Sequence, residues 1–75
     1  MNFEIEFEQE TDGRWIAEIR EIPGVLAYGA TRSQAGAKAK ALALRVLADR
    51  MENEASIPDI NSIAFASRHE SVAVN

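Results

Sequence analysis

Residues 12–35 read DGRWIAEIREIPGVLAYGATRSQA and hold most of the turn signals of this chain. Three of the four glycines, one of the two prolines, the only Trp and the only Tyr lie there. Asp12-Gly13 is typical of a hairpin, because glycine takes a positive φ without steric cost. Pro23-Gly24 suits the two central positions of a type II turn. The segment therefore predicts a hairpin turn, a strand, a second turn and another strand in succession.

Residues 2–10, which precede the hairpin, alternate between apolar and acidic side chains. This period of two predicts a strand with one buried face and one solvated face. The apolar set is Phe3, Ile5 and Phe7, and the acidic set is Glu4, Glu6 and Glu8. Residues 14–21 predict the return strand, with Trp15 as a core anchor on the Phe3 side. Residues 25–28 predict a third strand, in which Tyr28 is compatible with a core position or with a wet sheet edge.

A helix start follows the third strand. Gly29 ends that strand, Thr31 is a good N-cap, and Gln34 completes a capping box. Residues 35–54 are rich in strong helix formers. The 3,4 spacing predicts a buried face through Ala35, Ala39, Leu42 and Val46, widened by Ala43 and Leu47. Residues 62–67 predict a short fourth strand.

These elements predict an α+β fold with the order β-β-β-α-β. It consists of a three-stranded antiparallel sheet, one long helix and a fourth short strand. The 75 residues make one domain, with a core over about residues 2–67 and a frayed tail over 68–75. Seven residues receive structural roles in turns, packing and capping: Asp12, Gly13, Trp15, Pro23, Gly24, Gly29 and Thr31.

Composition narrows the classes of function. The absence of cysteine excludes disulfides, thiolate zinc sites and a cysteine nucleophile, and it fits a reducing cytosol. The first residues lack the basic and apolar regions of a signal peptide, and no apolar run approaches the ~20 residues that span a bilayer. We therefore expect a cytoplasmic protein with no membrane partner. Because a single-layer sheet leaves a face and edges uncovered, we expect a homo-oligomer and favour a dimer.

The net charge of −4 is unevenly distributed. Residues 1–30 carry seven acidic and two basic side chains, whereas residues 31–50 carry one acidic and five basic ones. The sheet half is thus acidic and the helix basic. An acidic sheet attracts a basic partner and repels nucleic acid, although both surfaces also suit ordinary solvated faces.

The sequence contains no recognisable catalytic arrangement, and we expect no catalytic residue, cofactor or metal. The carboxylates of Glu4, Glu6 and Glu8 are compatible with acid–base or metal chemistry, but a row on one strand favours a solvated face. His69 has no neighbouring ligand residues that would suggest a metal site. The basic helix leaves nucleic-acid binding as an alternative. Its phosphate contacts would come from Arg32, Lys38, Lys40 and Arg45.

One ordered set of residues resembles the HicB-like antitoxin domain and covers roughly residues 3–65. The set is Asp12, Gly13, Trp15, Ala17, Glu18, Ile22, Pro23, Gly24, Val25, Tyr28, Gly29, Thr31 and Ala35. In that family an Asp-Gly hairpin leads to a Trp-bearing strand, a Leu-Pro-Gly turn and a Gly-x-Thr helix start. Here Ile22 replaces the usual Leu and Gln34 the usual Glu. Both replacements keep the physical role, an apolar anchor and a capping-box partner.

The resemblance implies a partial ribonuclease-H-like fold. It also implies an antitoxin that neutralises HicA, a small basic toxin that cleaves messenger RNA, by covering the toxin's catalytic face. Many complete antitoxins carry a C-terminal helix-turn-helix or ribbon-helix-helix that binds the operator. Only about twenty residues follow the predicted helix here, and they read as loop and strand, so we expect no direct DNA binding.

The residues that we expect to face a partner are Glu4, Glu6, Glu8, Glu18 and Tyr28. Two alternatives to the antitoxin interpretation remain open. The first is a solitary oligomeric domain of the same family without a toxin. The second is a ribonuclease-H-like relic that uses the carboxylates of residues 4–8 with a divalent metal, although such chemistry needs carboxylates that converge from several elements.

Overall fold

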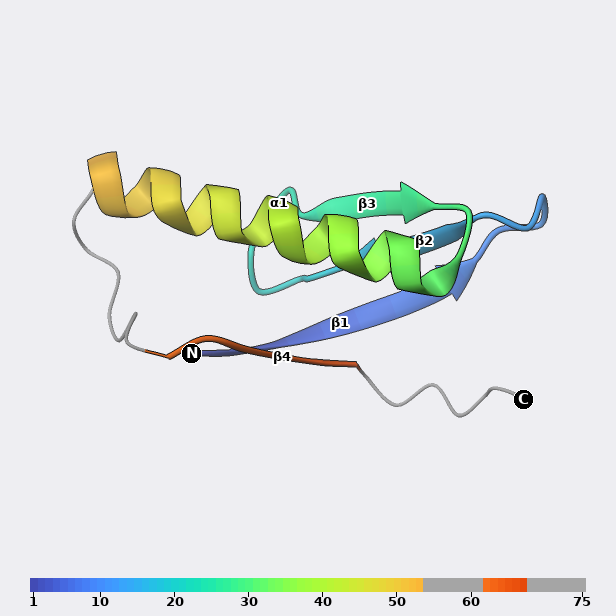
Figure 1. Cartoon of the computed structure of the whole chain (residues 1–75), viewed down its shortest axis with the longest axis horizontal. Helices are drawn as coiled ribbons and strands as arrows, with labels where there is room; N and C mark the ends of the chain where they lie inside the picture. The colour runs from blue at the N-terminus through green and yellow to red at the C-terminus, as the bar shows by residue number, and fades with distance from the viewer. Residues whose placement is uncertain (54–61, 68–75) are drawn as a thin grey trace.

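The computed structural model describes residues 1–53 and 62–67, which form one sheet with a helix on one of its faces (Figure 1). The elements are β1 (Asn2–Gln9), β2 (Trp15–Glu18), β3 (Leu26–Gly29), α1 (Arg32–Asn53) and β4 (Ala64–Ser67). The prediction of an α+β chain with three strands, a helix and a short fourth strand is confirmed. The expected tail over 68–75 lies outside the described residues.

The strand order in the sheet is β3-β2-β1-β4. The strands β1, β2 and β3 are antiparallel, with Phe7 opposite Ala17 and Ala17 opposite Ala27. The strand β4 adds to β1 in parallel, with Phe3 opposite Phe65 at a ring-centroid distance of 5.8 Å. The sheet is therefore mixed, and the connection through α1 carries the chain from one edge of the sheet to the other.

The core lies between α1 and one face of the sheet. Its buried residues are Phe3, Ile5, Ala17, Ile19, Ile22, Val25, Ala35, Ala39, Ala43 and Leu47. The predicted pairing of the Phe3 set with the Ala17 set on one face is confirmed. Trp15 lies on the expected side but is only half-buried at the margin of this core, because it pairs with Gln9 at the end of β1. The largest fully buried side chains are Ile5, Ile19, Ile22 and Val25. Full burial of such an aliphatic side chain contributes about 1.5–3 kcal/mol, so these residues make large contributions to the core.

The hairpin between β1 and β2 has a three-residue loop, Thr11 to Gly13. The amide of Glu10 donates to the carbonyl of Arg14 at 2.7 Å, and Gly13 has a φ of 95°. This geometry is common for three-residue hairpins that end in a left-handed residue. Asp12 accepts hydrogen bonds from the Arg14 amide at 3.1 Å and from its Nε at 2.9 Å. The bond from the backbone amide is the main reason that the pKa of Asp12 lies below its ordinary value.

The second strand ends earlier than expected, at Glu18 instead of residue 21. The chain forms turns there: Ile22 N donates to Ile19 O and Val25 N donates to Ile22 O, both at 3.2 Å. Gly24 has a φ of 88°, as the third position of a type II turn requires. These bonds direct Ile19, Ile22 and Val25 into the core, so apolar burial continues where strand pairing stops.

The helix start agrees with the predicted N-cap. The Thr31 hydroxyl accepts a hydrogen bond from the Gln34 amide at 3.0 Å. The Gln34 side chain reaches back to the amide of Ala30 at 3.0 Å, one residue before the position bonded in a standard capping box. The centre of the buried helix face differs from the prediction. It follows the i, i+4 row Ala35, Ala39, Ala43 and Leu47, while Leu42 and Val46 lie half-buried beside it.

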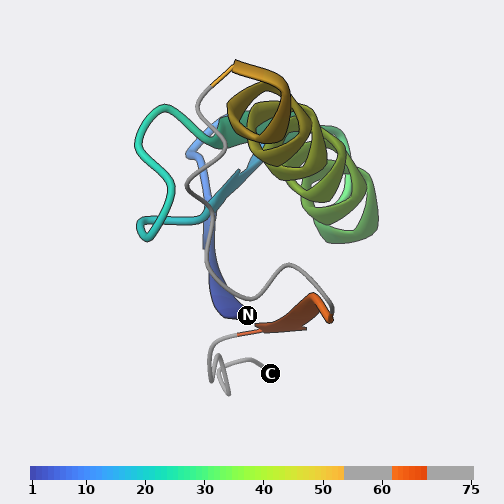
Figure 2. The same cartoon turned by 90° about the vertical axis from the view of Figure 1, so that its left-hand side faces the viewer.

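Gly29 allows α1 to approach the sheet closely. A Cβ at this residue would lie 2.5 Å from the Ala35 nitrogen and 2.9 Å from the Gln34 Cβ. Gly36 is less crowded, since a Cβ there would meet only the end of the Phe7 ring, at 3.1 Å. The helix consequently packs mainly against β3 and β2, and Figure 2 shows it on one side of the sheet.

We predict that Gly29→Ala lowers the free energy of unfolding by about 3 kcal/mol, because a backbone atom cannot yield to the new methyl group. The matched control is Gly36→Ala. Its clash is with a side-chain end that can shift, and a gain in helix propensity of up to about 1 kcal/mol offsets it. Urea denaturation of both variants measures the difference. Equal losses would contradict a backbone contact at Gly29.

Candidate functional site

The face of the sheet opposite α1 carries every residue predicted to meet a partner. We call it the open face and define it by Glu4, Glu6, Glu8, Ile16, Glu18, Leu26 and Tyr28. Alternation along each strand places these side chains away from the core residues. The five predicted residues come from three strands, so the fold brings together positions that are up to 24 residues apart in the sequence.

Two rows of side chains cross the open face. One row runs from Glu8 through Ile16 to Tyr28, and the other from Glu6 through Glu18 to Leu26. Each row therefore begins with a carboxylate on β1 and ends with a large apolar side chain on β3. The result is a surface with an acidic side and an apolar side.

Arg20 connects the acidic residues of the second row. Glu6 and Glu18 stand directly opposite each other, an arrangement in which like charges destabilise a sheet. The guanidinium of Arg20 lies 3.1 Å from Glu6 Oε1 through Nη2 and 3.8 Å from Glu18 Oε1 through Nε. The Arg20 side chain is 70% exposed, so it offsets the repulsion between Glu6 and Glu18 at the surface of the protein.

Two shallow hollows adjoin Arg20. One has a volume of about 190 Å³ and is lined by acidic and apolar residues and by Arg20: Glu6, Phe7, Glu8, Ile16, Glu18 and Arg20. The other has a volume of about 220 Å³ and is lined by the β2–β3 connection, residues 18–20 and 22–26. Both are smaller than the ~300 Å³ at which small-molecule sites begin, so the face better fits side chains of a protein partner.

The apolar side of the open face was not predicted as a unit. Leu26 and Tyr28 are exposed, and Ile16 is half-buried between them and β1. Arg14 lies over the Tyr28 ring, 4.9 Å from its centroid. The alternation of residues 14–21 already separates Ile16 from the core set, but only the β2–β3 register joins it to Leu26 and Tyr28.

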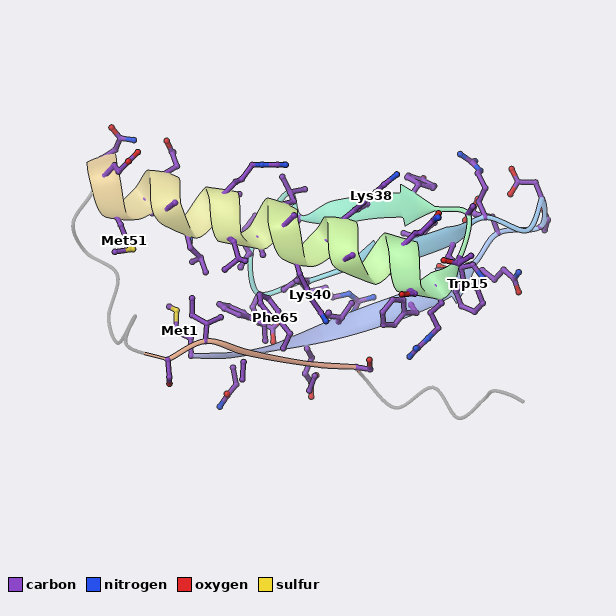
Figure 3. All side chains as sticks on the ribbon, in the orientation of Figure 1. Met1, Trp15, Lys38, Lys40, Met51 and Phe65 are labelled. Carbon is purple, nitrogen blue, oxygen red and sulfur yellow. The ribbon has the colours of Figure 1, made fainter. Side chains whose placement is uncertain are left out.

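The basic residues of α1 do not gather into one patch. Lys38 and Lys40 are two residues apart, which places them about 200° apart around a helix. Figure 3 shows Lys38 on the β3 side of the helix and Lys40 directed towards β1. Arg32 stacks on the Phe7 ring at 4.1 Å from its centroid. This divergence gives little support to a phosphate-binding helix.

The acidic residues of the open face do not form a metal cage. Within residues 1–53 and 62–67, no group of three or more His, Cys, Asp or Glu side chains could hold a metal ion. The carboxylates of Glu4, Glu6 and Glu8 stand in a row along β1, as expected from their spacing. His69 lies outside the described residues.

Comparisons of the chain with protein-family models, with curated proteins and with solved structures found no match. The one helix among the described residues, α1, is not apolar enough over a sufficient length to cross a membrane.

We predict that Arg20→Gln lowers the free energy of unfolding by about 0.2–1 kcal/mol, the range of exposed ion pairs. The loss arises from the unrelieved repulsion between Glu6 and Glu18, so it shrinks in high salt. Arg45→Gln on α1 serves as the control for removing one positive charge. Urea denaturation at low and high salt measures both variants, and a loss at Arg20 that salt leaves unchanged would contradict the electrostatic origin.

Proposed function

We propose that this chain is a protein-binding module of the HicB-like antitoxin type, which acts in the cytoplasm and neutralises a small basic RNA-cleaving toxin by covering it. The observation that carries the proposal is the open face, where a carboxylate row adjoins an exposed apolar strip. The proposed action is occlusion of another protein's catalytic surface. It requires no chemistry from this chain.

The fold supports the family assignment. The element order β-β-β-α-β is the order that the resemblance implies. The residues that carry the resemblance have matching local roles: Gly13 and Gly24 adopt positive φ, Thr31 caps the helix, and Gly29 allows its close approach. We assign the sheet to the partial ribonuclease-H-like type on this basis.

The electrostatics of the open face support a basic protein partner. Complementary charge speeds encounter and excludes acidic partners. The apolar strip of Ile16, Leu26 and Tyr28 offers the desolvated contact area from which protein interfaces derive most of their affinity. The combination favours a protein surface over a nucleic acid, because phosphate groups would meet the carboxylates of β1.

Two other functions have weaker support. A solitary domain without a toxin would use the same fold and is distinguished by the absence of a binding partner. A metal-dependent nuclease would need carboxylates that converge on one point, whereas Glu4, Glu6 and Glu8 stand in a row. Incubation of labelled RNA with the protein and magnesium or manganese tests that alternative. It requires that the protein cleaves the RNA and that Glu6→Gln abolishes the cleavage.

The test of the proposed function uses the protein encoded by the neighbouring reading frame as the probe. We expect a short basic protein that inhibits growth when it is expressed alone and is neutralised by this chain. Glu8→Lys and Glu18→Lys should each raise the dissociation constant by about tenfold or more, equal to about 1.4 kcal/mol, because each places a cation opposite a basic surface. Calorimetric titration measures the affinities.

Glu52→Lys is the matched control, since it makes the same charge change at the far end of α1. The substitution changes the net charge of the chain as much as Glu18→Lys does, but far from the open face. We therefore expect the dissociation constant for the basic protein to change less than twofold. If Glu18→Lys and Glu52→Lys weaken binding equally, the open face is not the interface. If the neighbouring protein does not bind, the antitoxin proposal fails and the solitary domain remains.

A further inference from the structure

The outer edge of β3 presents backbone groups that no described strand pairs with, because β3 is the terminal strand in the order β3-β2-β1-β4. The amide of Ile19 donates to the carbonyl of Val25 at 3.0 Å, so Val25 directs its backbone groups towards β2. Backbone groups of an antiparallel strand alternate in direction. Ala27 and Gly29 therefore also face β2, while Leu26 and Tyr28 direct their N–H and C=O groups outward.

The helix start limits this edge on one side. Ala30 is the next residue whose backbone groups would face outward, and its amide donates to the Gln34 side chain at 3.0 Å. The pairing-competent edge is thereby centred on Ala27, with one outward-facing residue on either side of it. Such an edge is self-complementary, because a two-fold axis at Ala27 exchanges Leu26 and Tyr28.

The β3 edge lacks the features that normally prevent strand pairing. Leu26–Gly29 contains no charge and no proline, which are the usual protections of exposed edges. Leu26 and Tyr28 are 43% and 42% exposed, so they offer apolar surface beside which a partner strand would pack. An uncharged edge with exposed apolar side chains is a typical site of strand addition.

The partner that this edge fits is a second copy of this chain, because the edge is self-complementary and neutral whereas the open face is acidic. A two-fold contact through the open face would set the carboxylates of β1 either against their own copies or against the apolar side chains of β3, and both arrangements are unfavourable. The β3 edge avoids both arrangements. Its own residues are neutral, Glu18 lies one strand away on β2, and the carboxylates of β1 lie two strands away.

We propose that two copies of this chain pair antiparallel through their β3 strands and form one continuous sheet. Leu26 lies opposite the partner's Tyr28, and both N–H···O=C bonds form at each of these two equivalent pairs. The side chains of such a pair, one aliphatic and one aromatic, favour each other across strands. The two open faces then join into a single larger surface, and both helices lie on the other side.

Sedimentation equilibrium of the full chain tests the proposal. We expect a dimer with twice the 8.2 kDa mass of the chain. Leu26→Lys should raise the dimer dissociation constant at least tenfold, about 1.4 kcal/mol, since it places a charge on the paired edge. Leu44→Lys is the matched control: Leu44 is 46% exposed on α1, and its substitution should leave the constant within about twofold. Circular dichroism verifies that both variants fold.

A disulfide provides a second measurement that does not depend on a destabilising substitution. The chain has no cysteine, so a single introduced thiol is unambiguous. Residues at the two-fold position form a non-hydrogen-bonded pair with Cα atoms about 4.5 Å apart, within the range of disulfides. Ala27→Cys should therefore oxidise to a covalent dimer, whereas Ala66→Cys on β4, the other edge, should not.

Three results would overturn the proposal. The first is a monomer at every concentration of the unmodified chain. The second is dissociation by Leu44→Lys but not by Leu26→Lys. The third is efficient crosslinking of Ala66→Cys in place of Ala27→Cys, which would assign the contact to β4. Both measurements are made without any toxin, so they are independent of the antitoxin proposal.

Discussion

The approach of the α1 backbone to the end of β3 governs the arrangement of this molecule. Only a residue without a Cβ leaves room for the Ala35 nitrogen beside Gly29. The cap formed by Thr31 and Gln34 starts the helix at this point. The small side chains of the alanines at 35, 39 and 43 then keep the helix close to the sheet along the next turns. The helix is thus held over β3 and β2, and no other described element covers the opposite face of the sheet.

That one-sided covering produces two surfaces of different character. The open face carries the carboxylates of β1 beside the apolar side chains of β2 and β3, with Arg20 placed between Glu6 and Glu18. The outer edge of β3 is neutral and offers backbone groups. A charged face suits a partner of opposite charge, and a neutral edge suits a copy of itself. The two surfaces share Leu26 and Tyr28, but strand pairing uses the backbone groups of these residues and keeps their side chains on the joined open face.

Much of the fold and of the site was predictable from local patterns. The alternation of residues 2–10 separates Phe3 and Ile5 from the acidic residues, and the structure places both sets accordingly. The turns at Gly13 and Gly24 and the cap at Thr31 also agree. The residues expected to meet a partner all lie on one face. Helix periodicity was less accurate, because Leu42 and Val46 resemble core residues in spacing but lie beside the alanine row that the sheet contacts.

Whether a feature was predictable from the sequence depends on how far apart along the chain the interacting residues lie. Turn conformation, capping and side-chain alternation depend on sterics and hydrogen bonds between residues that are neighbours along the chain, so the amino-acid sequence alone specifies them. The early end of β2, the parallel addition of β4 to β1, and the meeting of Ile16 with Leu26 and Tyr28 depend on packing between distant segments. Those contacts compete for the same apolar surface, and the outcome of that competition appears only when the helix and the sheet are packed together.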